Sequence, residues 1–294
     1  MLTLGAKVPN SGELPQRLGI GAMAAHLEEA GFESLWVSDH VVMPATIESR
    51  YPFAADGRAT WPSDTPYFDA VVALTLIAAA THRARFGTAV LVLPQREPVV
   101  LAKQLASLDC LSGGRLELGV GAGWLAEEFE ALNVPFSSRG SRLDEWIDLL
   151  RACWTGDPPA HEGRHYTLPA GVFCRPAAAH PIPLLIGGDS AAALRRAGAR
   201  CDGWLAHQSA LCLDPEALAK GDRQMRAAAR DAGRDPDALR LVLRIIDSAG
   251  RADEVARAIP ALTAAGADEI IVDVDWESGD GPAEAFETLA NVVA

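Results

Sequence analysis

The sequence is short of paired cysteines and of basic residues, and each shortage excludes a class of protein. Its five cysteines are scattered over 294 residues with no CxxC pair, so neither a disulfide framework nor a zinc knuckle is indicated. Lys and Arg total 26 against 39 Asp and Glu, which gives a net charge of −13. This balance argues against nucleic acid or an anionic membrane surface as the main partner.

The sequence also predicts no membrane span, no targeting segment and no metal site. The longest apolar run, residues 70–80, is interrupted by Thr75 and is far shorter than the roughly 20 residues that a membrane span needs. The first residues lack the basic-then-apolar pattern of a secretory signal. No H-x-H occurs, and the one H-E-x-x-H run, at residues 161–165, lies in an irregular segment and not on a predicted helix, so no metal site is expected. We therefore expect a cytoplasmic protein that binds no membrane.

Strand-like and helix-like segments alternate along the whole chain. This alternation predicts an α/β protein, a single (β/α)8 barrel domain over residues 1–294. Two irregular, proline-containing segments, 41–67 and 155–183, are expected as insertions over the mouth at the carboxyl ends of the strands. The strands are predicted at residues 2–8, 34–39, 84–93, 116–120, 184–189, 203–207, 239–248 and 269–275.

The fourth predicted strand runs into glycines at 119, 121 and 123, followed by Trp124. Residues without side chains let a flat or anionic ligand approach the backbone closely. A dinucleotide-binding turn is an alternative, but the spacing G-x-G-x-G differs from G-x-G-x-x-G. Trp124 is either core filling or the lining of a pocket for a ring.

His40 is the candidate catalytic residue, because it directly follows the second strand and barrel active sites lie at the carboxyl ends of strands. An imidazole that titrates near neutral pH suits proton transfer or the stabilisation of developing charge. The alternative is that His40 hydrogen-bonds loop backbone. Asp39 is expected to orient its neighbours, and the role of His207, at the end of the sixth strand, stays open.

The run Gly187-Gly188-Asp189-Ser190 joins the fifth strand to a helix start. Backbone N–H groups and the helix dipole at such a point make a site for an anion, phosphate above all. The other interpretation is a tight turn in which Asp189 or Ser190 caps the helix. Both interpretations can hold at once.

Several motifs together resemble the luciferase-like monooxygenase superfamily, particularly its branch of coenzyme F420-dependent oxidoreductases. The resemblance covers nearly the whole chain. It is carried by Ser38-Asp39-His40, by residues 86–94 and 111–124, by Glu127-Glu128 with Pro135-Phe136 and Arg142, by residues 150–155, and by Ile186-Gly187-Gly188 with Asp202-Gly203-Trp204.

The resemblance implies a redox enzyme acting on a small molecule, with coenzyme F420 (an 8-hydroxy-5-deazaflavin) or alternatively FMN lying across the strand ends. It also implies a homodimer, and a partner flavin reductase only if FMN is used. His40 matches the histidine that handles charge or a proton at the substrate carbon. The implied cofactor-binding residues are Asp39, Ala89, Val90, Gly121, Ala122, Gly123, Trp124, Gly187, Gly188, Asp189 and Ser190.

Two further expectations follow from the same resemblance. A non-prolyl cis peptide is expected at Ala89-Val90, where family members bulge the third strand beneath the ring. Sugar-phosphate dehydrogenase relatives carry a glutamate where this chain has Trp124, so their substrate chemistry is not transferred.

Trp61, Tyr67 and Phe173 are expected to line the pocket. The rival functions are an FMN-dependent monooxygenase, a non-catalytic flavin-binding protein and, last, a metal hydrolase.

Overall fold

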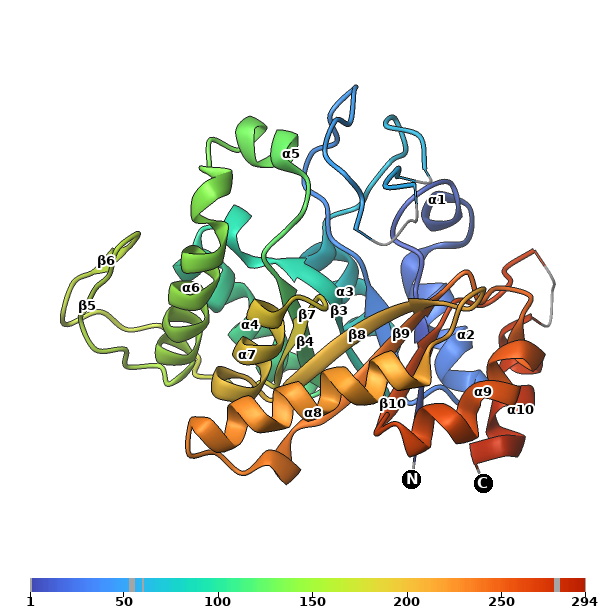
Figure 1. Cartoon of the computed structure of the whole chain (residues 1–294). Helices are drawn as coiled ribbons and strands as arrows, with labels where there is room; N and C mark the ends of the chain where they lie inside the picture. The colour runs from blue at the N-terminus through green and yellow to red at the C-terminus, as the bar shows by residue number, and fades with distance from the viewer. Residues whose placement is uncertain (1, 53–55, 60, 278–280, 294) are drawn as a thin grey trace.

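The computed structural model describes residues 2–52, 56–59, 61–277 and 281–293. They form a closed barrel of eight parallel strands in the order β1-β10-β9-β8-β7-β4-β3-β2, with helices outside (Figure 1). This confirms the predicted (β/α)8 fold. The barrel strands are β1 (Thr3–Lys7), β2 (Ser34–Val37), β3 (Arg85–Val92), β4 (Leu116–Gly121), β7 (Leu184–Gly187), β8 (Gly203–Ser209), β9 (Arg240–Ile246) and β10 (Glu269–Val272).

Helices follow each strand and cover the outside of the barrel, as the right-handed crossover of parallel strands requires. Alanine and leucine dominate several of them, so their inner faces pack closely on the strands. The helices are α1 (Leu14–Leu18), α2 (Ile20–Ala30), α3 (Ala70–Ala80), α4 (Pro98–Ser112), α5 (Ala126–Ala131), α6 (Arg139–Trp154), α7 (Ala191–Arg200), α8 (Pro215–Asp231), α9 (Ala252–Ala264) and α10 (Gly281–Val293).

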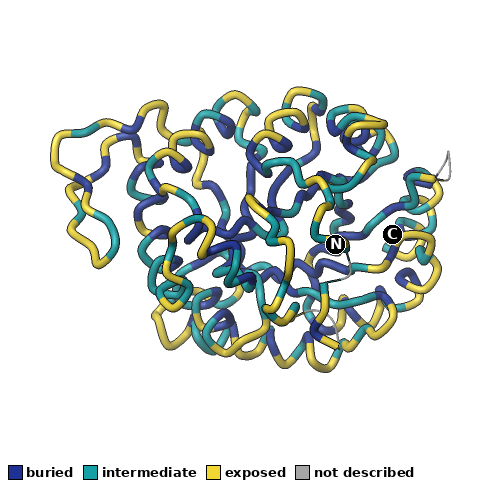
Figure 2. Tube along the Cα trace, turned by 90° about the horizontal axis from the view of Figure 1, so that it is seen from above, coloured by how far each residue is buried: buried dark blue, intermediate teal, exposed yellow. Residues whose placement is uncertain are grey.

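Side chains fill the middle of the barrel, which is therefore a packed core. The view along the barrel shows the buried chain gathered at the centre, with most exposed residues towards the outside (Figure 2). Alternate residues of each strand point inward. The middle layer that they form consists of Trp36, Leu185, Leu205, Val242 and Ile271, with Ala89 and Val90 packed against it.

Ion pairs close the amino-terminal end of the barrel. Glu117 and Glu269 are both buried there. Arg240 bridges them, with Nη1–Oε2 and Nη2–Oε2 distances of 2.6 Å each. Arg85 pairs with both carboxylates from the other side, and Ser34 Oγ donates to Glu269 at 2.5 Å. The barrel is thus sealed at this end by charged groups that satisfy one another.

The two insertions lie in different places. Described residues of the first insertion lie beside α5 at the carboxyl end of the barrel: Ser49 N donates to Glu127 at 2.8 Å, and Ala126 N to Ser49 Oγ at 3.0 Å. The expectation that residues 155–183 cross the mouth is wrong. Their hairpin of β5 (His161–Glu162) and β6 (Thr167–Leu168) lies on the outer flank beside α6 in two views (Figures 1 and 2).

Contacts with α6 and α4 hold this second insertion on the flank. Glu145 of α6 accepts hydrogen bonds from the backbone of His165 and Tyr166 at 3.0 and 2.9 Å. Asp109 of α4 accepts one from Ala179 N at 2.8 Å. Phe173, expected in the pocket, is 66% exposed on this flank and contributes nothing to the mouth.

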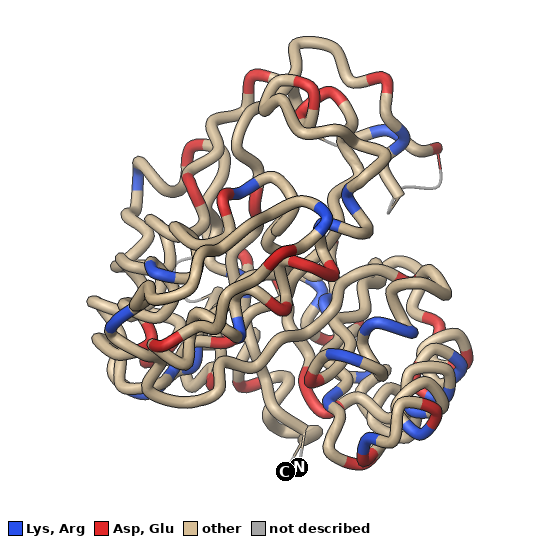
Figure 3. Tube along the Cα trace, turned by 90° about the vertical axis from the view of Figure 1, so that its left-hand side faces the viewer, with Lys and Arg blue, Asp and Glu red and all other residues tan. Residues whose placement is uncertain are grey.

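The outer helices carry interspersed acidic and basic residues (Figure 3). Among the described residues, no helix is long and apolar enough to span a membrane. In the same part of the chain, no cluster of three or more His, Cys, Asp or Glu side chains could hold a metal ion.

Candidate functional site

His40 lies at the carboxyl end of the barrel and is held there by a carboxylate. Its side chain is 9% exposed, and Nδ1 lies 3.1 Å from Oε2 of Glu128, which is itself buried. The other oxygen, Oε1, accepts hydrogen bonds from Val41 N and Val42 N at 2.6 and 3.2 Å. Burial opposes the charge of Glu128, but the hydrogen bond and charge of His40, together with further hydrogen bonds such as that from Val41 N, outweigh it, so the pKa of Glu128 is lowered.

This arrangement fixes the tautomer of His40. An ionised carboxylate can only accept, so Nδ1 carries the proton that it shares with Glu128. Among the described residues, the hydrogen bond of the imidazole is at Nδ1, so the lone pair of Nε2 can take a proton from another molecule. A histidine oriented by a carboxylate on one nitrogen, with the other free for a ligand, can act as a general acid or base.

Aromatic side chains surround the imidazole. Ring centroids lie 5.1 Å from His40 for Tyr67, 6.2 Å for Trp61 and 6.1 Å for Trp124. Tyr51 joins the group, 5.1 Å from Trp61 and 5.2 Å from Trp124. Trp61, Tyr67 and Trp124 thus form an aromatic wall beside His40, and Trp124 belongs to this wall rather than to the barrel core.

Asp39 connects His40 to the third strand. Its Oδ2 accepts from Val92 N at 2.9 Å, and its Oδ1 from Arg96 Nη2 at 2.6 Å. Burial raises the pKa of Asp39, and Arg96 opposes that shift. Within the described residues these are its hydrogen bonds, and they tie the end of β2 to the end of β3.

The third strand is bulged where the sequence predicted. The peptide bond Ala89-Val90 is cis, and the pairing of β3 with β4 shifts register between Thr88 and Leu91. The cis peptide is confirmed. The side chain of Val90 takes the space beside two glycines, since a Cβ on Gly121 would lie 2.9 Å from Val90 Cγ2 and one on Gly187 2.5 Å from Val90 Cγ1.

Neighbouring side chains thus explain why these strand-end positions are occupied by glycine. Gly121 and Gly187 make room for Val90. A Cβ on Gly123, which has φ +84°, would meet Phe129 at 2.6 Å and Val92 at 2.7 Å. Ala122 is partly exposed beside them. The carboxyl ends of β3, β4 and β7 consequently form a low, small-residue surface with Val90 on it.

The run from Gly187 to Ser190 forms the turn into α7 and caps that helix. Ser190 caps α7, its Oγ accepting from Ala193 N at 3.2 Å. Gly188 has φ +98°, and a Cβ there would meet nothing closer than 3.8 Å. Asp189 is exposed and lines a cavity of about 280 Å³ together with His207 and Lys220. The backbone at this helix start is open to an anion.

The opposite half of the strand ends is polar. His207, Arg244 and Asp273 lie two residues beyond inward-facing members of the middle layer; because strand side chains alternate, these three also face inward. Arg244 Nη2 pairs with Asp273 Oδ1 at 2.5 Å. Lys7 ends β1. Burial and Arg244 lower the pKa of Lys7 to about 8 and that of His207 to about 3.

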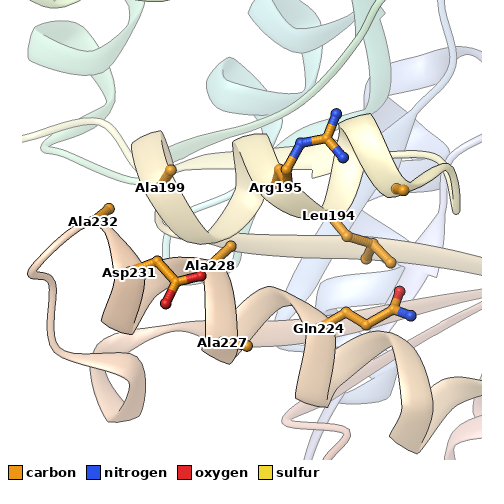
Figure 4. A pocket seen from close by; sticks show the side chains of 9 residues that line it. Leu194, Arg195, Ala199, Gln224, Ala227, Ala228, Asp231 and Ala232 are labelled. Atoms are coloured by element: carbon orange, nitrogen blue, oxygen red, sulfur yellow. The ribbon is translucent and has the colours of Figure 1, made fainter.

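One hollow lies away from this site. It has a volume of about 510 Å³ and lies between α7 and α8 on the outside of the barrel. Figure 4 shows its lining of small side chains, Ala199, Ala227 and Ala228 among them. Arg195, Gln224 and Asp231 also line it, but it lies outside the barrel, and the candidate active site is the group around His40.

The bulged strand, the histidine past β2 and the closed parallel barrel define a class of (β/α)8 protein. The model of the family "Luciferase-like monooxygenase" matches residues 8–280, and the chain belongs to that family. An uncharacterised protein of Mycobacterium tuberculosis is 40% identical over 183 residues, 62% of this chain and 63% of its own length. An F420-dependent glucose-6-phosphate dehydrogenase of Nakamurella multipartita is 36% identical over 201 residues, 65% of this chain and 52% of its own.

Solved structures share the fold over nearly the whole chain at low identity. An F420-dependent secondary alcohol dehydrogenase, solved with an F420–acetone adduct, has a TM-score of 0.78 at 18% identity, covering 99% of both chains. The FMN-bound oxygenating constituent of 3,6-diketocamphane monooxygenase from Pseudomonas putida has a TM-score of 0.76 at 16% identity, covering 100% of this chain and 98% of that one. A curated relative is thus F420-dependent, and proteins of the same fold include both F420-dependent and FMN-bound enzymes.

Sequence reasoning missed several residues of the site. Glu128 was part of the family motif, but nothing in the sequence showed that it contacts His40. Lys7 and Arg244 carry a recognisable signal, because each is a charged residue inside an apolar strand. Tyr51 lies in an insertion with no regular pattern, and its position depends on tertiary contacts alone.

Proposed function

We propose that this protein is an oxidoreductase that transfers a hydride between coenzyme F420 and a small organic substrate at the carboxyl ends of the barrel strands. The observation that carries the proposal is the buried pair of His40 and Glu128, placed within the aromatic wall and tied through Asp39 to the bulged third strand. The F420-dependent dehydrogenase relative supports the choice of cofactor.

The residues present fit a planar cofactor with a phosphate-bearing tail. Trp61 Nε1 is buried, and among the described residues it has no hydrogen-bond partner, so it is available to a polar ring atom. Val90, with Ala89, Gly121, Ala122, Gly123 and Trp124, would hold the ring. Gly187, Gly188 and Ser190, with Asp189 beside them, would hold the phosphate at the start of α7.

The chain's own groups have separable tasks in this proposal. When bound, the deazaflavin supplies two-electron hydride chemistry. His40 holds or accepts the substrate proton at Nε2, while Glu128 stabilises the charged imidazole and fixes its orientation. Tyr51, Trp61 and Trp124 exclude water from the reacting atoms. With Trp124 at the position of the glutamate of the sugar-phosphate dehydrogenases, the substrate faces an apolar wall.

The test is an equilibrium titration of the purified full-length protein with coenzyme F420 and, separately, with FMN, read by fluorescence. We expect a dissociation constant on the order of micromolar or tighter for F420 and weaker binding of FMN. Ser190→Asp keeps a good helix cap but adds a negative charge at the phosphate position, so it should weaken binding. Ser190→Asn caps equally well without the charge and is the matched control.

The second candidate is an FMN-dependent monooxygenase that receives reduced flavin from a partner reductase, a function favoured by the FMN-bound structural neighbour. Tighter binding of FMN than of F420, with oxygen consumption by the protein and reduced FMN, would replace the first proposal by this one. Tight cofactor binding without any substrate-dependent redox change would indicate a non-catalytic flavin-binding protein. Binding of neither cofactor would contradict all three.

A further inference from the structure

Lys7 is a cation placed deep in the mouth of the barrel. It is the last residue of β1, and its side chain faces inward with Gly5, whose Cβ direction leads to Ser34, Trp36 and Glu269. Lys7 keeps part of its surface open. Within the described residues its ammonium forms no hydrogen bond or ion pair. An inward ammonium with its hydrogen-bonding capacity unused is placed to receive a ligand atom.

The charges around Lys7 leave a local surplus of positive charge. Arg244 is 5% exposed and is balanced by Asp273 at 2.5 Å. His207 faces Arg244 across the β8–β9 pairing, and because burial and Arg244 lower its pKa to about 3, it is neutral at neutral pH. Asp273 also attracts Lys7, so two cations, Lys7 and Arg244, share one carboxylate here, in a protein whose net charge is −13. Such a local reversal of sign favours one kind of ligand, an anion.

Tyr51 connects this cationic group to the surroundings of His40. Its ring contacts Trp61 and Trp124, and its phenol interacts electrostatically with Arg244. A ligand that reaches from His40 past Tyr51 meets planar aromatic side chains first and positive charge next. Its skeleton must then be flat, with the anionic group at one end.

We propose that Lys7 and Arg244 form a subsite for the anionic group of a planar organic ligand bound against the aromatic wall. The inference rests on the proposed function only in placing the reacting atoms at His40. Two sources share this chemistry: a carboxylate on the substrate, and the acidic ring hydroxyl of the deazaflavin. The subsite itself stands on Lys7, Arg244 and Tyr51 and is tested without assuming either.

The experiment compares benzoate with the neutral isostere benzamide, titrated against the full-length protein by calorimetry, first alone and then with saturating F420. Wild type should bind benzoate at least about tenfold more tightly than benzamide, because a charge-assisted hydrogen bond is lost in the amide. Lys7→Gln should abolish that preference. Lys103→Gln removes an exposed lysine of α4 and serves as the control.

The arms distinguish the sources. A preference that survives saturation with F420 assigns the subsite to a substrate carboxylate. A preference that disappears on saturation, with weaker F420 binding by Lys7→Gln, assigns it to the cofactor ring. Equal binding of benzoate and benzamide by the wild type, or the same preference in Lys7→Gln as in wild type, overturns the proposal. If F420 does not bind at all, the titration of the protein alone still decides the subsite.

Discussion

At the scale of single residues, the contact between His40 and Glu128 decides how the imidazole works. We expect His40→Ala to retain cofactor binding and to lose about 10²- to 10⁴-fold in turnover, the usual contribution of a general acid or base. Glu128→Gln keeps the shape of the contact but removes its charge. The acid limb of its kcat–pH profile should then move to lower pH, because the imidazolium loses its anionic partner.

Glu127→Gln is the matched control for this experiment. Glu127 holds the backbone of Glu48 and Ser49 at 2.6 and 2.8 Å and does not contact His40. A lower kcat in both glutamine variants with an unchanged pH profile would assign Glu128 to loop anchoring alone. Turnover at the wild-type level in His40→Ala would remove the histidine from the mechanism.

Single residues also show how far the sequence predicts this site. His40 and the cis bond at Ala89-Val90 were predictable because short local motifs carry them. The partnership of His40 with Glu128 was not, since it depends on how α5 packs against the end of β2. The position of Tyr51 was not predictable either, because this residue lies in an irregular segment.

At the scale of elements, strand periodicity predicts all the strands of the barrel, because each buried strand has its own apolar run and turn signals. The insertions were predictable as irregular segments, but not in their placement. Residues 155–183 follow α6 back along its outer side because Glu145 and Asp109 bind their backbone. Proline content alone does not reveal these partners.

The pairing of β8 with β9 makes stability depend on pH. His207 lies opposite Arg244, and its pKa falls from 6.5 to about 3 through burial first and Arg244 second. Between these values the unfolded chain binds more protons than the folded one. The free energy of unfolding should therefore decrease as pH falls from 6.5, with this residue contributing up to about 1.4 kcal/mol per pH unit.

Urea denaturation between pH 4.5 and 7 measures this dependence. His207→Gln should show a shallower decline than wild type on acidification. His180→Gln, at an exposed histidine, should decline as steeply as wild type. Parallel curves for wild type and His207→Gln would mean that other groups dominate the acid sensitivity.

At the scale of the whole molecule, the face formed by α3 and α4 carries exposed apolar side chains that could pack against a second copy of the chain. Val72 and Leu76 on α3 and Val100 on α4 are 58, 47 and 57% exposed, and the two helices pack against each other. We propose that this face forms a homodimer contact, because contiguous exposed apolar residues mark interaction sites. Light scattering after size exclusion should give twice the chain mass for wild type.

A charge at the centre of this face should dissociate the pair. Leu76→Glu is expected to give the mass of one chain at micromolar concentration, while Phe173→Glu, at an exposed apolar residue on the opposite insertion, should leave the mass unchanged. A monomeric wild type, or a Leu76→Glu variant that remains a dimer, would contradict the assignment of this face.

Ligands can reach the barrel from one end only, because ion pairs close the other; these are formed by Arg85, Glu117, Arg240 and Glu269. Because these ion pairs close the amino-terminal end and the middle layer fills the centre, the barrel is open only at its carboxyl end. A cofactor and a substrate that react at His40 must therefore both enter and leave through the carboxyl end of the barrel. The molecule that binds deeper must bind first and dissociate last, so the fold imposes an ordered binding sequence.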